Sequence, residues 1–243
     1  MLTSNNEKQN TNIDIDIKIS KNQSIRVNVN NESGYLTDVR QINNITGLSE
    51  PLIDLKIDGE FNRLIILPDS LITLSINGKF NQPIILPNNI AFFLINGIFN
   101  QPIILSHLDN LKNISIKGEF NQPIILPHLK ILYIGGKYTQ PIILPTSLII
   151  LNINGIFNQP IILSHLDILY TLKISGEYNQ SIIIPDNVMN LKIYGEFNQP
   201  IIFPKSLRIL EFKNKYNQPI ILPYIIDKFS IGGEVSLIRC PIL

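Results

Sequence analysis

The chain has little of the chemistry from which most active sites and metal sites are built. Its 243 residues include one cysteine (Cys240), three histidines and no tryptophan. A single cysteine excludes a disulfide framework within the chain and fits a reducing compartment, so we expect a cytoplasmic protein. The 20 basic and 19 acidic residues leave a net charge of +1, which gives nucleic acid no basic surface to bind.

Long apolar runs are also lacking. The aliphatic stretches are interrupted by proline, asparagine or lysine, and they are well below the roughly 20 residues that a membrane-spanning helix needs. Residues 1–12 are polar and lack the apolar segment of a secretory signal, so we expect a disordered tail there. The composition therefore predicts neither a membrane partner nor a nucleic-acid partner.

What the chain does contain is a repeat. An aromatic residue, a small polar residue and in most copies a glutamine are followed by a short aliphatic run, most fully in residues 80–87, Phe-Asn-Gln-Pro-Ile-Ile-Leu-Pro. This period of 18 to 21 residues predicts a solenoid, in which each coil buries its apolar face against its neighbours. The nine aromatic residues are Phe61, Phe80, Phe99, Phe120, Tyr138, Phe157, Tyr178, Phe197 and Tyr216.

Each repeat predicts two extended segments. Before the aromatic residue comes Leu-x-x-Leu-x-Ile, as in Leu71, Leu74 and Ile76, and this alternation predicts a strand with one buried face. After it comes Pro-Ile-Ile-Leu-Pro or a close variant, which predicts a return segment that is either a short strand or polyproline-like. The two segments and their corners leave no room for a helix of normal length, so the fold class is all-β.

A glycine precedes the aromatic residue by two positions in eight copies, and Asn214 takes its place in the ninth. Glycine and asparagine tolerate positive φ, so the slot predicts a left-handed corner at the end of each strand. These glycines are Gly59, Gly78, Gly97, Gly118, Gly136, Gly155, Gly176 and Gly195.

The residue after the aromatic is asparagine in eight copies and Thr139 in the other. Both side chains can hydrogen-bond backbone groups that a coil inside a stack cannot leave to water. The row is therefore expected to form a buried polar ladder, and a row of ligand-binding amides is the alternative.

The two ends of the array differ from its middle. Residues 13–19 and 25–29 alternate apolar and polar side chains and predict a β-hairpin that caps the first coil, while residues 35–49 predict a short helix or loop. A tenth coil keeps Ile226, Phe229 and Ile231 but has Val235 in place of the aromatic residue. We therefore predict a right-handed, LRR-like β-solenoid of about nine coils, divided into a tail (1–12), an N-terminal cap (13–50), the solenoid (51–223) and a degenerate capping coil (224–243).

The Phe-Asn-Gln-Pro-Ile-Ile-Leu-Pro units resemble the FNIP repeat family, which is named for Phe-Asn-Ile-Pro at the equivalent place. The resemblance covers about residues 52–223, and the Leu-x-x-Leu-x-Ile segment also resembles short leucine-rich repeats. It implies an LRR-like solenoid that serves as a protein-interaction module. Many family members carry an F-box and are thought to select substrates for ubiquitin ligases. Residues 1–50 show alternating strands and no F-box pattern, so this adaptor role is not carried over.

Few residues suggest catalysis. His107, His128 and His165 lie in turns and are interpreted as turn residues. Glu177 and Glu196 occupy one slot in neighbouring coils and would be the carboxylates of a β-helix-type polysaccharide hydrolase, which is the alternative function. Other copies of that slot hold lysine, as in the pair Glu119 and Lys137, so a surface charge ladder is the preferred interpretation. We predict no catalytic residue, no metal and no cofactor.

The outward positions of the strands give the candidate binding face. Most coils place polar groups there, but the third to sixth coils place aromatic and aliphatic residues, and two polar-aromatic positions extend the face. Exposed apolar neighbours are typical of a protein-binding patch. We therefore predict a monomeric, non-catalytic scaffold that binds an unknown protein partner on its strand face, with a self-assembling rod as a further alternative. The candidate residues are Phe92, Leu94, Ile131, Tyr133, Ile150, Lys192 and Tyr194.

Overall fold

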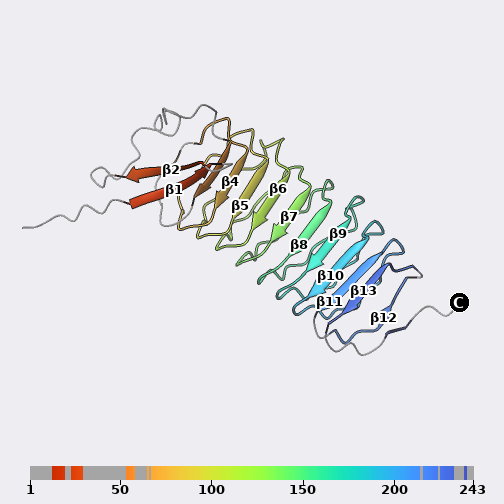
Figure 1. Cartoon of the computed structure of the whole chain (residues 1–243). Coiled ribbons are helices and arrows are strands. Elements are labelled where there is room, and N and C mark those ends of the chain that lie inside the picture. The colour runs from red at the N-terminus through yellow and green to blue at the C-terminus, as the bar shows by residue number, and fades with distance from the viewer. Residues whose placement is uncertain are drawn as a thin grey trace, which may run out of the picture.

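The structure, a computed structural model, describes most of the repeat region (Figure 1). Side chains are described for residues 53–57, 65, 67–213, 216–223 and 225–232, and the backbone is also described for strands at 13–19, 23–29 and 238–239. The expected tail (1–12) and the segment expected to be a helix or loop (35–49) lie outside the described residues. All elements in the described part are strands, as the repeat predicts.

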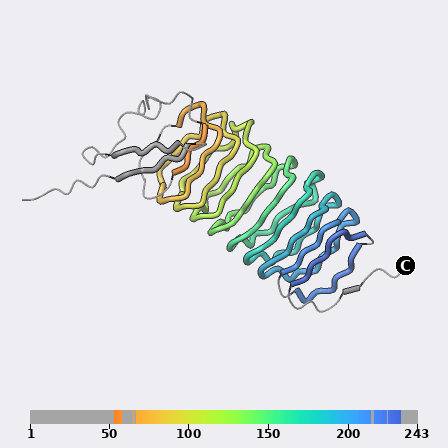
Figure 2. The backbone as a smooth tube through the Cα atoms, in the orientation of Figure 1, coloured from red at the N-terminus to blue at the C-terminus, as the bar shows by residue number. Residues whose placement is uncertain are grey.

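Ten strands form one parallel sheet, in the order β13-β11-β10-β9-β8-β7-β6-β5-β4-β3 (Figures 1 and 2). Equivalent leucines face one another in successive strands, for example Leu132 with Leu151, so every coil has the same register. The β-solenoid prediction is confirmed. The strands are β3 (Asp54–Ile57), β4 (Thr73–Ile76), β5 (Phe92–Ile95), β6 (Asn113–Ile116), β7 (Ile131–Ile134), β8 (Ile150–Ile153), β9 (Thr171–Ile174), β10 (Asn190–Tyr194), β11 (Ile209–Lys213) and β13 (Lys228–Ile231).

The return segments differ from the strand side. Among the described coils only the last return segment is a strand, β12 (Ile220–Ile221), and it pairs in parallel with β14 (Ile238–Arg239). In the other coils we find no backbone hydrogen bonds between successive return segments of the described chain. The turn after most of these segments is closed locally, as where Ile90 N–H donates to Pro87 O at 3.2 Å. The sheet therefore carries the hydrogen-bonded ladder, and most return segments are extended without one.

The two ends of the array use strands of their own. Strands β1 (Ile13–Ile19) and β2 (Gln23–Val29) form the predicted antiparallel hairpin. Strand β1 lies beside β3, the first strand of the parallel sheet. At the other end β13 continues the sheet, and Phe229 and Ile231 are only partly buried there.

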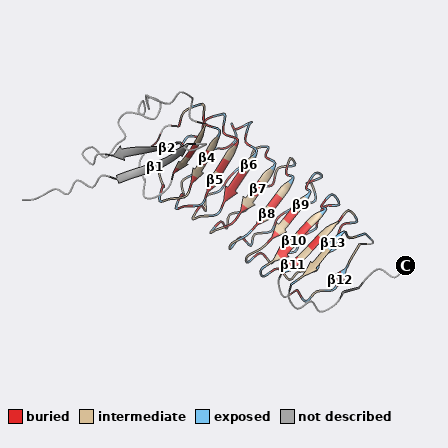
Figure 3. Ribbon diagram, in the orientation of Figure 1, coloured by how far each residue is buried: buried red, intermediate tan, exposed pale blue. Residues whose placement is uncertain are grey.

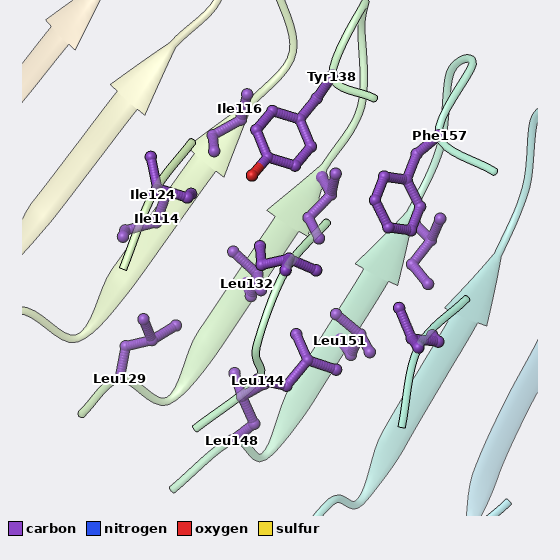
Figure 4. Close-up of a cluster of buried hydrophobic side chains, with 14 of the residues drawn as sticks. Ile114, Ile116, Ile124, Leu129, Leu132, Tyr138, Leu144, Leu148, Leu151 and Phe157 are labelled. Atoms are coloured by element: carbon purple, nitrogen blue, oxygen red, sulfur yellow. The ribbon is translucent and has the colours of Figure 1, made fainter. Parts of the chain in front are cut away.

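The aromatic residues form a continuous spine through the core. Their side chains are fully buried from Phe80 to Tyr216, and neighbouring ring centroids lie 6.0–6.4 Å apart with interplanar angles of 1–17°. Inward strand residues and the inner residues of the return segments pack around the rings, as Leu132, Leu144 and Leu151 do beside Tyr138 and Phe157 (Figures 3 and 4).

Two spine hydroxyls have no hydrogen-bond partner. Tyr138 Oη and Tyr178 Oη are buried and unpaired, whereas Tyr216 Oη donates to Gln199 O at 3.0 Å. Burial raises the pKa of Tyr138 to about 12 and raises that of Tyr178 further, because the apolar core cannot solvate a phenolate.

This difference predicts opposite effects for one substitution. A buried donor without an acceptor costs about 1–3 kcal/mol, so Tyr138→Phe and Tyr178→Phe should each raise the free energy of unfolding by about 1 kcal/mol. Tyr216→Phe removes a satisfied hydrogen bond and should lower it by a similar amount. Urea denaturation of the three variants measures these changes, and a loss of stability in all three would contradict the assignment.

The corner glycines fall into two sets. Gly97 and Gly118 do not have positive φ, so the left-handed prediction is wrong for them. A Cβ at either position would lie 2.0 Å from a glycine carbonyl oxygen in the preceding coil. At these two positions a larger residue is excluded by the close approach of the backbones of neighbouring coils, and not by positive φ. Asn214 lies outside the described residues. The prediction is confirmed, with φ of +60° to +76°, at Gly136, Gly155, Gly176 and Gly195.

The asparagine row forms the predicted ladder but is not buried. The Asn100 N–H donates to Asn81 Oδ1 at 2.8 Å, and the same bond recurs along the array at 2.8–3.0 Å. Asn158 and Asn217 are exposed, and the other members are half-buried. The ladder lies at the corner, where solvent reaches its outer side. The amide oxygens of the six described asparagines from Asn81 to Asn198 each accept from a backbone N–H of the next coil, which favours a structural role over the alternative of ligand binding.

Candidate functional site

The strand face has a regular geometry that fixes which outward residues meet. Ile131 of β7 pairs with Ile150 of β8, so these two candidate residues are direct neighbours. Phe92 and Leu94 of β5 lie one strand further away, because Asn113 and Ser115 of β6 stand between the two groups. The apolar face is therefore interrupted by one polar strand, and its residues are half-buried by their neighbours on the sheet.

A small cavity opens on this face around Tyr133. It has a volume of about 170 Å³ and is lined by Lys117, Tyr133, Asn152, Asn154 and Lys173, with the backbone of the β7 corner. Lys117 Nζ lies 5.7 Å from the centre of the Tyr133 ring, which is a cation–π distance. Two lysines and two amides around one aromatic ring make a site suited to an acidic or amide-bearing side chain.

The second aromatic candidate, Tyr194, lies among charged side chains. Lys173 Nζ and Lys213 Nζ lie 5.1 and 5.5 Å from its ring centre. Its hydroxyl hydrogen-bonds Glu211, and burial together with this contact raises the pKa of Tyr194 to about 12. Lys213 lies 3.0 Å from Glu211 and the candidate Lys192 lies 3.6 Å from it. Two lysines flank the Glu211 carboxylate and a third, Lys173, lies over the Tyr194 ring, so this end of the face is basic.

Glu211 stays ionised at the centre of this group. Hydrogen bonds from Lys213 and Tyr194 hold the pKa of its carboxyl at about 2, below the ordinary value of 4.5. The Glu211 carboxylate therefore remains charged throughout the neutral range.

The residues considered for catalysis do not converge. Glu177 and Glu196 are exposed at the corner edge. His107 Nε2 donates to Leu86 O at 2.9 Å and His165 Nε2 donates to Leu144 O at 2.8 Å, which ties each turn to the coil before it. The expected surface pair forms, with 2.8 Å between Lys137 Nζ and a Glu119 carboxylate oxygen.

Two other kinds of feature are absent from the part of the chain that the structure describes. Its residues include no group of three or more histidine, cysteine, aspartate or glutamate side chains placed to hold a metal ion. They also include no helix with the length and apolar character needed to cross a membrane.

The return face carries an apolar row that the sequence analysis missed. The fifth residue after each aromatic is isoleucine in all eight described coils, and these side chains are 59–91% exposed. We call this row the isoleucine stripe. A column of exposed prolines, such as Pro83 and Pro141, runs beside it. The stripe consists of Ile85, Ile104, Ile125, Ile143, Ile162, Ile183, Ile202 and Ile221.

A signal for the stripe was present in the sequence. In an extended segment successive side chains alternate between faces, so burial of Ile84 and Leu86 requires Ile85 to point outward. Applying this period of two to the return segment, as was done for the strand, would have found the stripe. The aliphatic run was instead interpreted only as an extended segment that forms the other side of the coil.

Comparisons with known proteins agree with the repeat. The FNIP Repeat family model matches residues 178–215, which run from Tyr178 to the residue before Tyr216 and so comprise two coils. No curated protein matches the chain. Among solved structures, CroV588, described as a novel circular LRR protein, is similar with a TM-score of 0.64 and 31% sequence identity, over 74% of this chain and 30% of CroV588. The chain thus spans less than a third of that relative. It is a solenoid of LRR-like fold in which residues 178–215 match the FNIP repeat.

Proposed function

We propose that the protein is a non-catalytic scaffold that binds a protein partner on its strand face. The observation that carries the proposal is the combination of Tyr133, flanked by Lys117 and Lys173 around a cavity, with the apolar neighbours Ile131 and Ile150. Aromatic side chains with an apolar body and a polar tip, beside long cationic side chains, are enriched where proteins bind each other. Solenoids commonly use an extended sheet face in this way.

The chemistry of the face describes the partner. Apolar side chains of the partner would cover Ile131, Ile150 and Phe92, and an acidic side chain would enter the cavity between Lys117 and Lys173. Further acidic groups would lie against the lysines around Tyr194. We place this encounter in the reducing cytoplasm, which suits a chain with one cysteine.

A capture experiment tests the proposal. Wild-type protein and the double variant Phe92→Ser/Tyr133→Ser are used as bait in a reducing cell lysate, and bound proteins are compared by quantitative mass spectrometry. We expect the variant to capture at least tenfold less of the specific partner than the wild type does. Truncating the two side chains should cost at least about 1.4 kcal/mol of binding free energy, which corresponds to a factor of ten in affinity.

The matched control is Ile98→Ser/Ile156→Ser, which removes two exposed apolar side chains from the corner, away from both the strand face and the isoleucine stripe. This variant should capture the same partners as the wild type. All three proteins should share their circular dichroism spectrum and melting temperature within a few degrees. Equal capture by folded wild type and folded Phe92→Ser/Tyr133→Ser would place the binding face elsewhere.

A further inference from the structure

The isoleucine stripe needs an explanation that the coil itself does not provide. Side chains on the inside of the return segment have a packing role, but those of the stripe point away from the core. An extended backbone is satisfied equally by valine or threonine, so conformation alone does not require isoleucine in every described coil. The outward strand positions, by contrast, change freely from coil to coil, as Phe92, Asn113 and Ile131 do.

The stripe is also larger than the apolar patches of ordinary monomers. Each exposed isoleucine presents on the order of 100 Å² of apolar surface, so eight present roughly 800 Å², beyond the few hundred Å² that a monomer usually leaves open. About 800 Å² per partner is what a standard protein–protein interface buries. The stripe and the proline column contain no charged residue in the described coils.

We propose that the return face binds the return face of a second copy of this chain, giving a two-fold dimer. A partner for this stripe must present apolar groups at the spacing of one per coil over a length on the order of 40 Å. Another copy of the same solenoid has this spacing, because its own stripe also places one isoleucine in each coil. A two-fold axis places the stripe against itself, so that the same surface serves both partners.

The surface between the isoleucines accepts such a partner. A depression of about 260 Å³ lies between the return segments of two neighbouring coils and is lined by Ile104, Pro123 and Ile125 among others. An isoleucine from the facing copy can occupy a depression of this kind, as the ridges of one surface enter the grooves of the other. Because the stripe is uncharged, the association should depend only weakly on salt concentration.

The dimer would replace the monomer expected from the sequence and would add a property to the scaffold. With the return faces in contact, the two strand faces point outward on opposite sides of the dimer. The protein would then present two equivalent partner-binding faces. The dimer itself does not depend on the function proposed for the strand face, because its surface is separate.

Sedimentation velocity across a concentration series tests the proposal with the full chain. The wild type should shift from 27.6 kDa towards about twice that mass between roughly 1 and 100 µM. The variant Ile125→Glu/Ile143→Glu should stay monomeric throughout, because burying two carboxylates in the interface is unfavourable. Raising the salt concentration from 0.1 to 1 M should leave the wild-type dimer intact.

The matched control is Ile98→Glu/Ile156→Glu. These isoleucines are exposed at the corner, in a slot that holds glutamate in other coils, so the substitution adds the same charge away from the stripe. This control should dimerise like the wild type. The proposal is overturned if the wild type stays monomeric at 100 µM or if the folded stripe variant dimerises as the wild type does. Assembly into species larger than a dimer would also overturn it, because a two-fold contact buries the whole stripe and leaves none for a third copy.

Discussion

Gly155→Val is expected to lower the free energy of unfolding by about 3–5 kcal/mol, enough to unfold a large fraction of the protein at 37 °C. Gly155 has a φ of +70°, which a β-branched side chain adopts only with strain. A Cβ there would also lie 2.4 Å from the carbonyl oxygen of Gly136 in the preceding coil. Either effect alone is destabilising, and the backbone cannot relieve one without disturbing the neighbouring strand.

Thermal unfolding followed by circular dichroism measures the effect, with Gly232→Val as the matched control. Gly232 is exposed, and a Cβ at this position would meet nothing closer than 3.6 Å, so the control should change stability by less than about 1 kcal/mol. Gly97→Ala separates the two causes. Gly97 lacks positive φ but has a Cβ distance of 2.0 Å to Gly78 O, so a neutral Gly97→Ala would show that close approach does not constrain the corner.

Phe157→Ala should be the most damaging change in the spine. The ring is fully buried and stacks on Tyr138 and Tyr178, with 6.1 Å between centroids on each side. Truncating a buried phenylalanine to alanine typically costs 3–5 kcal/mol, because the transferred apolar surface is lost and a cavity remains. Both neighbouring tyrosines also lose a stacking contact, so the upper part of this range is expected.

Urea denaturation of Phe157→Ala measures this loss, and Ile156→Ala is the control because that neighbouring side chain is 39% exposed. The control should change the free energy of unfolding by less than about 1 kcal/mol. Coils in a solenoid are coupled through their nearest neighbours, so weakening one coil in the middle should also broaden the transition. An equal, small effect of both substitutions would mean that the spine contributes little to the coupling between coils.

The sequence predicted the sheet well because the repeat imposes one register on every coil. The inward residues of Leu-x-x-Leu-x-Ile, such as Leu132 and Ile134, are buried where the period of two placed them. For the corner glycines the sequence predicted the residue type correctly, but the predicted positive φ was found at only some of them. Glycine in one slot can reflect positive φ or a close backbone approach, and the sequence alone does not separate Gly155 from Gly97.

The candidate site was less accessible to sequence reasoning. Outward positions were identified correctly, but the strand β6 that separates Leu94 from Tyr133 matters only once the strands are paired in space. The cavity beside Tyr133 depends on Lys117 and Lys173, which come from coils on either side. Nothing within one repeat indicates such a contact, because it is made between coils that are read separately along the chain.

The unequal construction of the two sides has a mechanical consequence. Strands in a sheet are held about 4.8 Å apart by hydrogen bonds, whereas the rings of the spine lie 6.0–6.4 Å apart and most return segments have no ladder. Bending that spreads the strands must break the backbone ladder, while bending that spreads the return segments loosens apolar contacts and breaks only single side-chain hydrogen bonds, such as that of His107 to Leu86 O. We therefore expect the solenoid to resist bending that stretches its sheet and to yield to bending that stretches its return face. Its strand face can then curve around a partner, but it resists being flattened.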